Sequence, residues 1–200
     1  MLISSVNFKG GQGKSLWAAI LASWFGPTTE ILDLDYNQGD AYAWAGKAKR
    51  PARLVNPTDL VVTLHDAAHA EQWFVADCPP HEGKETRYAL ELSAMVLIPV
   101  VPGGPNDFRG WGRMRSAIRD AKVLNPGLKA ATVLNASRRT SISREFYDQL
   151  TAWHAPKEGR AVLGMVPLRV AMSEALGVGD VPTDESVTAV LAKLRRFAAL

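Results

Sequence analysis

The sequence predicts an α/β fold: a doubly wound, mostly parallel sheet with helices on both faces. Short apolar segments of strand length alternate with longer amphipathic segments of helix length along the chain. Residues 94–101 (AMVLIPVV) are apolar almost without interruption, as expected of a strand that is buried on both faces of a parallel sheet. The 200 residues contain no repeat and no long linker, so the chain is expected to form a single domain over 1–200.

The first half of the chain contains three expected strands. A glycine-rich turn at 10–13 separates the first strand from the first helix, which Gly26 and Pro27 end. The region 40–72 has a weaker pattern, because a basic stretch that contains proline, KAKRPARLVNP, interrupts it. The elements expected here are strands at 2–7, 30–34 and 73–77, and helices at Ser15–Phe25 and from Thr58 to about Ala70.

The second half continues the alternation. After the buried strand at 94–101, the first two expected helices each lead into an apolar segment of strand length, and a third helix follows the last strand. The elements expected here are helices at 106–123, at 141–153 and from about Thr183 to Ala199, and strands at 129–135 and 161–166.

Composition places the chain among ordinary globular proteins. Hydrophobic residues make up 47% and charged residues 22%. The one cysteine, Cys78, can form no internal disulfide, which suits the cytoplasm. The N-terminal segment MLISSVNFKGG predicts neither a signal peptide nor a membrane span. The net charge of +3 and the pI near 9.1 permit binding to nucleic acid or acidic lipid but do not demand it.

The most informative segment is FKGGQGKSL, residues 8–16, which lies directly between a strand and a helix. Its glycines let the backbone curl so that successive N–H groups point into one cavity. Lys14 is placed to reach the outer phosphates of a nucleotide, and the Ser15 hydroxyl to bind Mg²⁺. The residues predicted to bind the nucleotide are Gly10, Gly11, Gln12, Gly13, Lys14, Ser15 and Leu16.

The loop departs from the ordinary P-loop in one informative way. That pattern requires glycine at position 8, where this chain has Phe8, but the deviant form K-G-G-x-G-K-[ST] matches. This loop resembles the signature of the ParA/MinD group of P-loop NTPases. The resemblance implies that Lys9 crosses a dimer interface to touch the partner's nucleotide, while Lys14 acts within its own subunit.

Two acidic residues end the second expected strand. Asp33 and Asp35 alternate with leucines, so both carboxylates point the same way, toward the crevice at the carboxyl ends of the strands. The segment resembles the family's D-x-D-P-Q, with Tyr36 in place of the proline and the glutamine one place later at Gln38. By this resemblance Asp35 orients the attacking water. Asp33 assists Mg²⁺ or braces the loop.

The third strand ends in WFVADCPP, which resembles the Walker B element of the same family. The resemblance implies that Asp77 holds Mg²⁺, through water. Cys78 is expected to be a small residue near the site and not a nucleophile, because no activating partner is identifiable in the sequence.

Further similarity runs through most of the chain. VLIPVVPGGPNDFRGWGRM resembles the strand and helix that follow Walker B, most closely in the small ParF-like plasmid partition ATPases. Asn135, in TVLNASR, and Pro167, in GMVPLRVAMSEA, fall in segments that approach the base in this family. They are therefore candidate contacts of the adenine.

The resemblance implies a Mg-dependent ATPase that hydrolyses ATP slowly to ADP and phosphate. Its implied partners are a second copy of the chain in an ATP-dependent homodimer, non-specific DNA, and a ParB-like or other adaptor that stimulates hydrolysis. Such a protein would position plasmid, chromosome or another cargo, and its implied location is cytoplasmic and associated with the nucleoid.

Basic residues that could contact DNA form several groups, since phosphate binding needs clustered cations and no fixed spacing. The family's DNA binding favours the last helix and Arg169. The preferred contacts are Arg169, Lys193, Arg195 and Arg196, and a second group is Arg109, Arg113, Arg115 and Arg119. A solvated helix face is the alternative interpretation of each group.

Three other functions stay open. The basic, partly amphipathic C-terminus TAVLAKLRRFAAL would also suit a MinD-like ATPase on a membrane surface. The unusual Gln12, Leu16 and Trp17 leave room for a scaffold that binds nucleotide without significant hydrolysis. His65 and His69 have the spacing of a zinc site, but H-D-x-x-H lacks an evident third ligand.

Overall fold

The computed structural model describes residues 1–102, 105–137, 141–167, 177–181 and 184–198. Seven strands form one sheet in the order β3-β2-β4-β1-β5-β6-β7, and every neighbouring pair is parallel. The strands are β1 (Leu2–Ser5), β2 (Glu30–Asp33), β3 (Ala52–Leu54), β4 (Phe74–Asp77), β5 (Met95–Val100), β6 (Lys129–Ser137) and β7 (Arg160–Pro167). The predicted parallel α/β sheet is confirmed.

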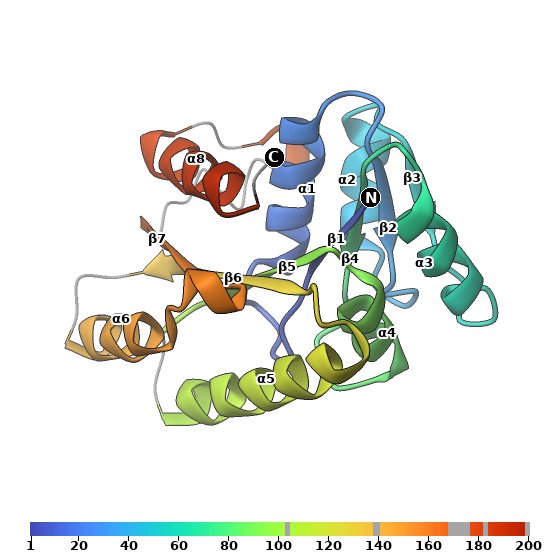
Figure 1. Ribbon diagram of the computed structural model, residues 1–200. Helices are drawn as coiled ribbons and strands as arrows, with labels where there is room; N and C mark the ends of the chain where they lie inside the picture. The colour runs from blue at the N-terminus through green and yellow to red at the C-terminus, as the bar shows by residue number, and fades with distance from the viewer. Residues whose placement is uncertain (103–104, 138–140, 168–176, 182–183, 199–200) are drawn as a thin grey trace.

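Helices cover both faces of this sheet (Figure 1). The helices α1 (Lys14–Phe25), α2 (Asp40–Lys47) and α8 (Glu185–Ala198) pack on one face. The helices α3 (Leu60–His69), α4 (Lys84–Leu92), α5 (Pro105–Leu124) and α6 (Ser141–Trp153) pack on the other, and a short 3₁₀ helix, Pro156–Glu158, leads into β7. No helix within the described ranges is long and apolar enough to cross a bilayer.

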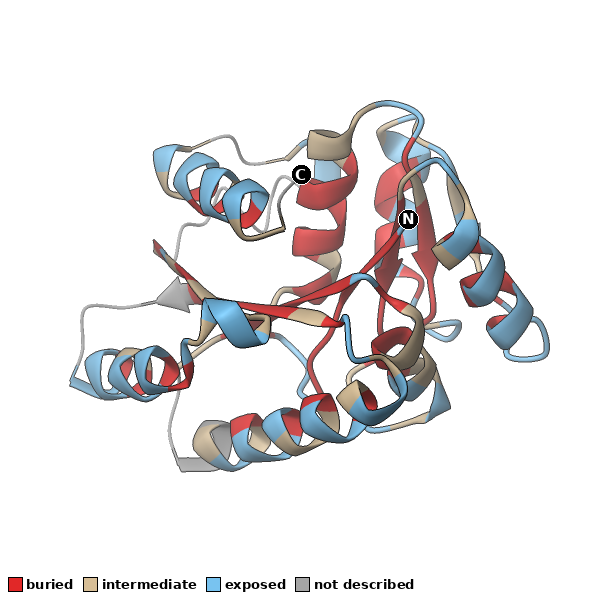
Figure 2. Ribbon diagram, in the orientation of Figure 1, coloured by how far each residue is buried: buried red, intermediate tan, exposed pale blue. Residues whose placement is uncertain are grey.

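The core is divided by the sheet into two clusters, because successive residues of a strand face opposite sides. In β1, Leu2 joins the cluster under α3–α6, while Ile3 joins the cluster under α1, α2 and α8. Figure 2 shows the central strands mostly in red, as the middle of three layers, and most of α1, which packs on one face of them, is red as well. Central strands that are apolar on both faces follow from this arrangement.

The sequence prediction missed α2, β3, α4 and the short 3₁₀ helix. The strand β3 has three residues at the edge of the sheet, none of them fully buried, so it carries no run of apolar residues. The helices α2 and α4 have eight and nine residues and three buried positions each, which is too short a stripe to stand out from flanking loops. Helix α3 begins at Leu60, two residues later than expected.

The order of the strands decides where a ligand binds. The chain moves from β1 outward to β2 and β3, returns to β4, and then continues on the far side of β1 with β5. Such a reversal opens a crevice at the carboxyl ends of the central strands. In this protein the loop after β1 and the acidic ends of β2 and β4 meet there.

Phe146 tests the packing of α6 on the sheet. Its ring is fully buried and stacks on Phe108 with centroids 4.6 Å apart. Phe146→Ala is expected to lower the free energy of unfolding by about 3–5 kcal/mol in chemical denaturation, because it opens a cavity. Ile142→Ala on the same helix is the control, since Ile142 is 42% exposed, and it is expected to change stability little. Equal effects of the two substitutions would contradict this packing.

Candidate nucleotide site

The loop between β1 and α1 is shaped by glycines. Gly11 has φ 70° and Gly13 φ 89°, in the left-handed region that favours glycine. A Cβ atom built on Gly13 would lie 2.2 Å from Nδ2 of Asn135, so any side chain there would have to displace that amide. The Ser5 hydroxyl donates a hydrogen bond to the Lys14 carbonyl over 2.9 Å, which closes the loop at its base.

Gln12 fastens the tip of this loop to two other strands. Its side chain is almost fully buried, and Oε1 accepts a hydrogen bond from the Val101 N–H over 2.8 Å, just after β5. Its carbonyl accepts a hydrogen bond from Nδ2 of Asn135 over 3.0 Å, from β6. The shape of the loop is therefore set by side-chain contacts with residues about 90 and 120 positions away along the chain.

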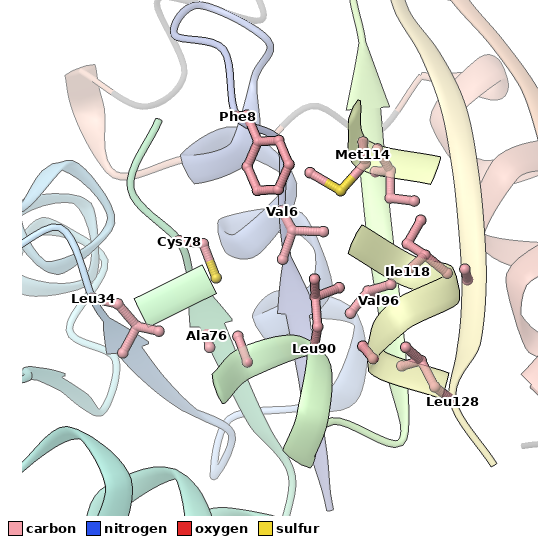
Figure 3. Close-up of a cluster of buried hydrophobic side chains, with 14 of the residues drawn as sticks. Val6, Phe8, Leu34, Ala76, Cys78, Leu90, Val96, Met114, Ile118 and Leu128 are labelled. Atoms are coloured by element: carbon pink, nitrogen blue, oxygen red, sulfur yellow. The ribbon is translucent and has the colours of Figure 1, made fainter. Parts of the chain in front are cut away.

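The substitution of Phe8 for the usual glycine has a packing reason. Its side chain is 8% exposed and belongs to the same hydrophobic cluster as Val6 and Met114 (Figure 3). A phenylalanine here anchors the start of the loop in the core, where glycine would leave that space to be filled by other side chains.

The two lysines of the loop differ in environment. Lys14 is 7% exposed, and its Nζ donates a hydrogen bond to the Lys9 carbonyl over 3.2 Å. Burial lowers the pKa of Lys14, against the opposing attraction of Asp77, Cys78 and Asp35. Lys9, in contrast, is exposed at the surface of the loop.

Asp33 and Asp77 stand side by side, since they are register partners in β2 and β4. Asp33 is fully buried, and its two carboxylate oxygens accept the N–H groups of Asp35 and Tyr42, each over 3.0 Å. Burial raises the pKa of Asp33, while these backbone bonds act to lower it. The contacts of Asp33 are those of a brace for the segment 35–42, and a metal contact from it stays a prediction.

Asp77 has a spare ligand atom. It is 2% exposed, and its Oδ1 is buried without a hydrogen-bond partner in the described part of the chain. Burial, with the negative charge of Asp33, raises its pKa to about 8, although a hydrogen bond from the Ser15 side chain and the charge of Lys14 act to lower it. A carboxylate and a hydroxyl that meet with an oxygen to spare fit a hard cation such as Mg²⁺.

These groups line a cavity of about 210 Å³. Asp35, half-buried, lies in its wall, as do the loop glycines predicted from the sequence. The complete lining is Gly10, Gly11, Gly13, Lys14, Ser15, Leu16, Asp35, Gln38, Asp40, Asp77, Cys78 and Pro80. Asp40 was missed by the sequence prediction, although an acidic residue in the first turn of a helix just after Gly39 was an available signal.

Asn135 lies against the phosphate loop, where its amide nitrogen supports Gln12. Its Oδ1 is buried and accepts no hydrogen bond from any described residue, so a base contact through that oxygen stays a prediction. Pro167 is the last residue of β7 and is half-buried. Both residues lie near the carboxyl ends of their strands, at the same edge of the sheet as the cavity.

The remaining candidates that the structure describes do not line the cavity. Lys193, Arg195 and Arg196 are exposed on α8, and Arg169 lies outside the described residues. His65 and His69 are exposed on α3 with ring centroids 4.3 Å apart. No cluster of three or more histidine, cysteine or acidic side chains suited to a metal occurs among the residues that the structure describes.

Similarity to known proteins extends over most of the chain. No family model matches the chain. The Maintenance of carboxysome distribution protein A of Halothiobacillus neapolitanus is 26% identical over 185 residues, which cover 88% of this chain and 85% of that protein.

Solved structures of ParA/MinD-type proteins share the fold. A plasmid partition protein from Borrelia burgdorferi B31, bound to AMPPNP, superposes with a TM-score of 0.75 at 14% identity over 98% of each chain. A variant of Cyanothece McdA in complex with ATP gives 0.73 at 11% identity, over 100% of this chain and 96% of that one. The MinD cell division protein of Aquifex aeolicus gives 0.70 at 14% identity, over 100% and 98%. The predicted resemblance to this group is confirmed at the level of the fold.

Asp77→Asn is expected to stabilise the protein in the absence of nucleotide and metal. The folded-state pKa of Asp77, about 8, lies above its ordinary value of 3.8, so the folded state holds this proton more tightly. Stability is therefore lost as pH rises from about 4 through about 8, and the amide removes that loss. Thermal melts should show a higher Tm for the variant at pH 8 and little difference near pH 4. Each kcal/mol gained in the free energy of unfolding should raise Tm by about 2–4 °C.

The matched control for that experiment is Asp66→Asn, because the Asp66 side chain is 75% exposed. Its Tm difference from the parent protein should stay near zero across the same pH range. A lower Tm for Asp77→Asn at pH 8 would contradict the assignment of a desolvated, strained carboxylate.

Gly13→Ala is expected to weaken ATP binding by roughly tenfold or more, because the left-handed backbone costs a non-glycine residue about 1–2 kcal/mol and the new methyl displaces Asn135. Isothermal titration calorimetry measures the dissociation constant for ATP. Gly46→Ala on α2 is the control, since nothing lies within 4 Å of the added carbon, and it should bind ATP as the parent does. Unchanged affinity in Gly13→Ala would show that the loop does not cradle the phosphates.

Proposed function

We propose that this protein is a ParA/MinD-type ATPase that binds Mg-ATP in the cavity at the carboxyl ends of β1 and β4. The observation that carries the proposal is the meeting of buried Lys14, buried Asp77 and Ser15 beneath a loop of left-handed glycines. A buried lysine and an underbonded carboxylate are costly in an empty site, and a phosphate with its cation would satisfy both.

The chain's own groups account for nucleotide binding. The backbone N–H groups of residues 10–15 and the N-terminus of α1 would bind the phosphates, with Lys14 against the outer ones. Ser15 and Asp77 would hold Mg²⁺, whose role when bound is to neutralise charge on the outer phosphates. Asn135 and Pro167 remain the proposed contacts of the adenine.

Asp35 is proposed to position the attacking water. Its carboxyl group lines the cavity, and its backbone N–H is held by Asp33 over 3.0 Å, which fixes where the side chain begins. Phosphoryl transfer depends mainly on positioning and on charge stabilisation, both of which rigid elements supply. Hydrolysis is expected to be slow, so that the ATP-bound state persists.

Lys9 is proposed to complete the site of a second copy of the chain. It is exposed on the loop that forms the cavity, so its side chain can reach a neighbouring subunit that faces the same cavity. Its carbonyl also accepts the hydrogen bond of Lys14, and a phosphate would compete for that lysine. Nucleotide binding is thereby linked to the surface that a second subunit would meet.

The proposed cellular role is the positioning of an intracellular cargo. The relatives named above are proteins of plasmid partition, of cell division and of carboxysome distribution. We propose that this protein works on non-specific DNA in the cytoplasm, with an adaptor that stimulates hydrolysis and specifies the cargo. A membrane surface is less well supported, because the apolar residues Val187, Val190 and Leu194 of α8 are buried against the sheet.

The mass of the purified protein tests the switch. Asp35→Ala should form a dimer with Mg-ATP and stay a monomer with Mg-ADP, since hydrolysis is blocked. Adding Lys9→Ala to that variant should abolish the dimer while leaving ATP affinity within about threefold, because Lys9 acts on the partner's nucleotide. If Asp35→Ala alone is a monomer with both nucleotides, the intermolecular role of Lys9 is contradicted and a nucleotide-binding scaffold is favoured.

A further inference from the structure

The charge of this protein is concentrated on one helix. α5 (Pro105–Leu124) contains four arginines and one lysine against two aspartates, a formal excess of three positive charges. The whole chain has a net charge of +3, so the rest of the sequence is balanced. A local concentration of this kind makes a field that a uniform distribution of the same charges would not make.

The arginines of α5 face away from the core. Met114 and Ile118 point into the hydrophobic cluster above the sheet (Figure 3), and Trp111 is buried with them. The side chains of Arg109, Arg113, Arg115 and Arg119 are all exposed. Pale blue turns alternate with red ones along α5 in Figure 2, as in a helix that is half in the core.

Two of these arginines are not neutralised by neighbours. Arg119 lies 3.3 Å from the Asp120 carboxylate and donates to the Ser116 hydroxyl over 2.9 Å. Within the described ranges, Arg113 and Arg115 form no ion pair. Their charges are therefore available to a ligand from outside the chain.

A glycine in the middle of this face is a second, independent observation. Gly112 is exposed, and a Cβ built on it would meet nothing within 4 Å. Its φ lies outside the left-handed region, so neither packing nor backbone geometry of this chain requires glycine there. Glycine lowers helix stability relative to alanine, so Gly112 weakens the helix, and no contact or backbone conformation of this chain explains its presence.

Helical spacing places Gly112 among the arginines. Residues three and four apart are neighbours on a helix surface, which puts Arg109, Arg115 and Ser116 around Gly112, with Arg113 next in sequence. The absent side chain leaves a stretch of bare helix backbone between cations, which we name the Gly112 hollow. A bare helix backbone between arginines lets a rod of negative charge come closer than a side chain at that position would allow.

We infer that the arginine face of α5, defined as Arg109, Gly112, Arg113, Arg115, Ser116 and Arg119, binds the phosphate backbone of duplex DNA. Clustered cations suit phosphates, whereas a membrane-binding face needs exposed apolar residues interspersed among its cations. On α5 the exposed apolar residues, Val123 and Leu124, lie beyond the last arginine, at the end of the helix. Phe108, Trp111 and Met114, the large apolar side chains of this stretch, are turned into the core. The inference rests on the proposed function in taking DNA as the surface on which the ATPase works.

This inference moves the main DNA contact from α8 to α5. The three cations of α8 lie near one end of that helix, against the single acid Glu185 at the other. The arginine face carries more charge over a longer row and includes the open glycine. Two copies of α5 in an ATP-bound dimer would double the number of bound phosphates, so DNA binding should be stronger in that state.

The test is binding of the full chain to a non-specific duplex, by fluorescence anisotropy, with Mg²⁺ and a slowly hydrolysed ATP analogue. Arg113→Ala/Arg115→Ala should bind at least about tenfold more weakly, and the slope of log K against log salt should fall by about 0.9 for each phosphate that the variant no longer neutralises. Lys193→Ala/Arg195→Ala on α8 removes two cations from another helix and is the matched comparison. Its affinity should fall by less than about threefold.

Gly112→Ala separates a binding role from a structural one. Alanine should raise Tm by about 2–4 °C, because it favours the helix, while it weakens DNA binding by crowding the hollow. If the face were only solvated, Gly112→Ala would raise Tm without lowering the affinity for DNA. A variant that is more stable but binds DNA less well therefore indicates a binding role. A Gly112→Ala protein with higher Tm and unchanged affinity would overturn the role of the hollow.

Mass and ATPase rate are measured on the same variants, so the two proposals can fail separately. Loss of affinity in the α8 pair alone, or a normal ATP-dependent dimer that binds no DNA at about 50 mM salt, would overturn the inference and leave the ATP switch standing. Binding to phosphatidylglycerol vesicles but not to DNA, abolished in the α5 pair, would overturn DNA as the ligand. Failure to dimerise with ATP would instead contradict the proposed function.

Discussion

The nucleotide site depends on holding Lys14 and Asp77 together almost out of water. A charged lysine and carboxylate are each costly to bury alone, and each shifts the other toward its charged form. Neither is fully satisfied: the Lys14 ammonium group donates a hydrogen bond to the Lys9 carbonyl, and Asp77 keeps one oxygen without a hydrogen bond from the described residues. The protein can fold with this site empty, but a phosphate would be needed to pair with Lys14 and a cation to pair with Asp77. Nucleotide binding would therefore change the contacts of the loop that carries Lys9, because a phosphate would replace the Lys9 carbonyl as the partner of Lys14.

The rest of the fold makes this arrangement rigid. Parallel pairing of β2 with β4 sets Asp33 beside Asp77, and Asp33 then fixes the segment that carries Asp35. Gln12 and Asn135 tie the loop to the ends of β5 and β6, and Phe8 anchors its beginning in the core. Since several strands contribute to one small cavity, a change at any of them reaches the phosphate loop. The β5 contact is of special interest, because the chain leads from Val101 toward α5 and its arginine face.

Sequence reasoning reached the parts of this site whose signal is local. The glycines, Lys14 and Ser15 form one continuous pattern, and Asp33, Asp35 and Asp77 each end an apolar strand, so their common edge of the sheet could be predicted. Contacts between distant segments could not. Nothing in the sequence shows that the Asn135 amide supports Gln12, 123 residues away, or that Asp33 is used up by backbone N–H groups. Short elements such as β3 and α4 were missed because they are stabilised by packing on neighbouring elements and not by a pattern in their own residues.

The central claim is that nucleotide completes a site that two copies of the chain share. The most direct measurement is the rate of ATP hydrolysis per molecule as a function of protein concentration, at saturating Mg-ATP. If Lys9 of one copy acts on the nucleotide of the other, the rate per molecule rises with concentration and levels off once the dimer is fully formed. A rate per molecule that is the same at every concentration, and equal in Lys9→Ala, would contradict a shared site and leave a P-loop ATPase that works alone.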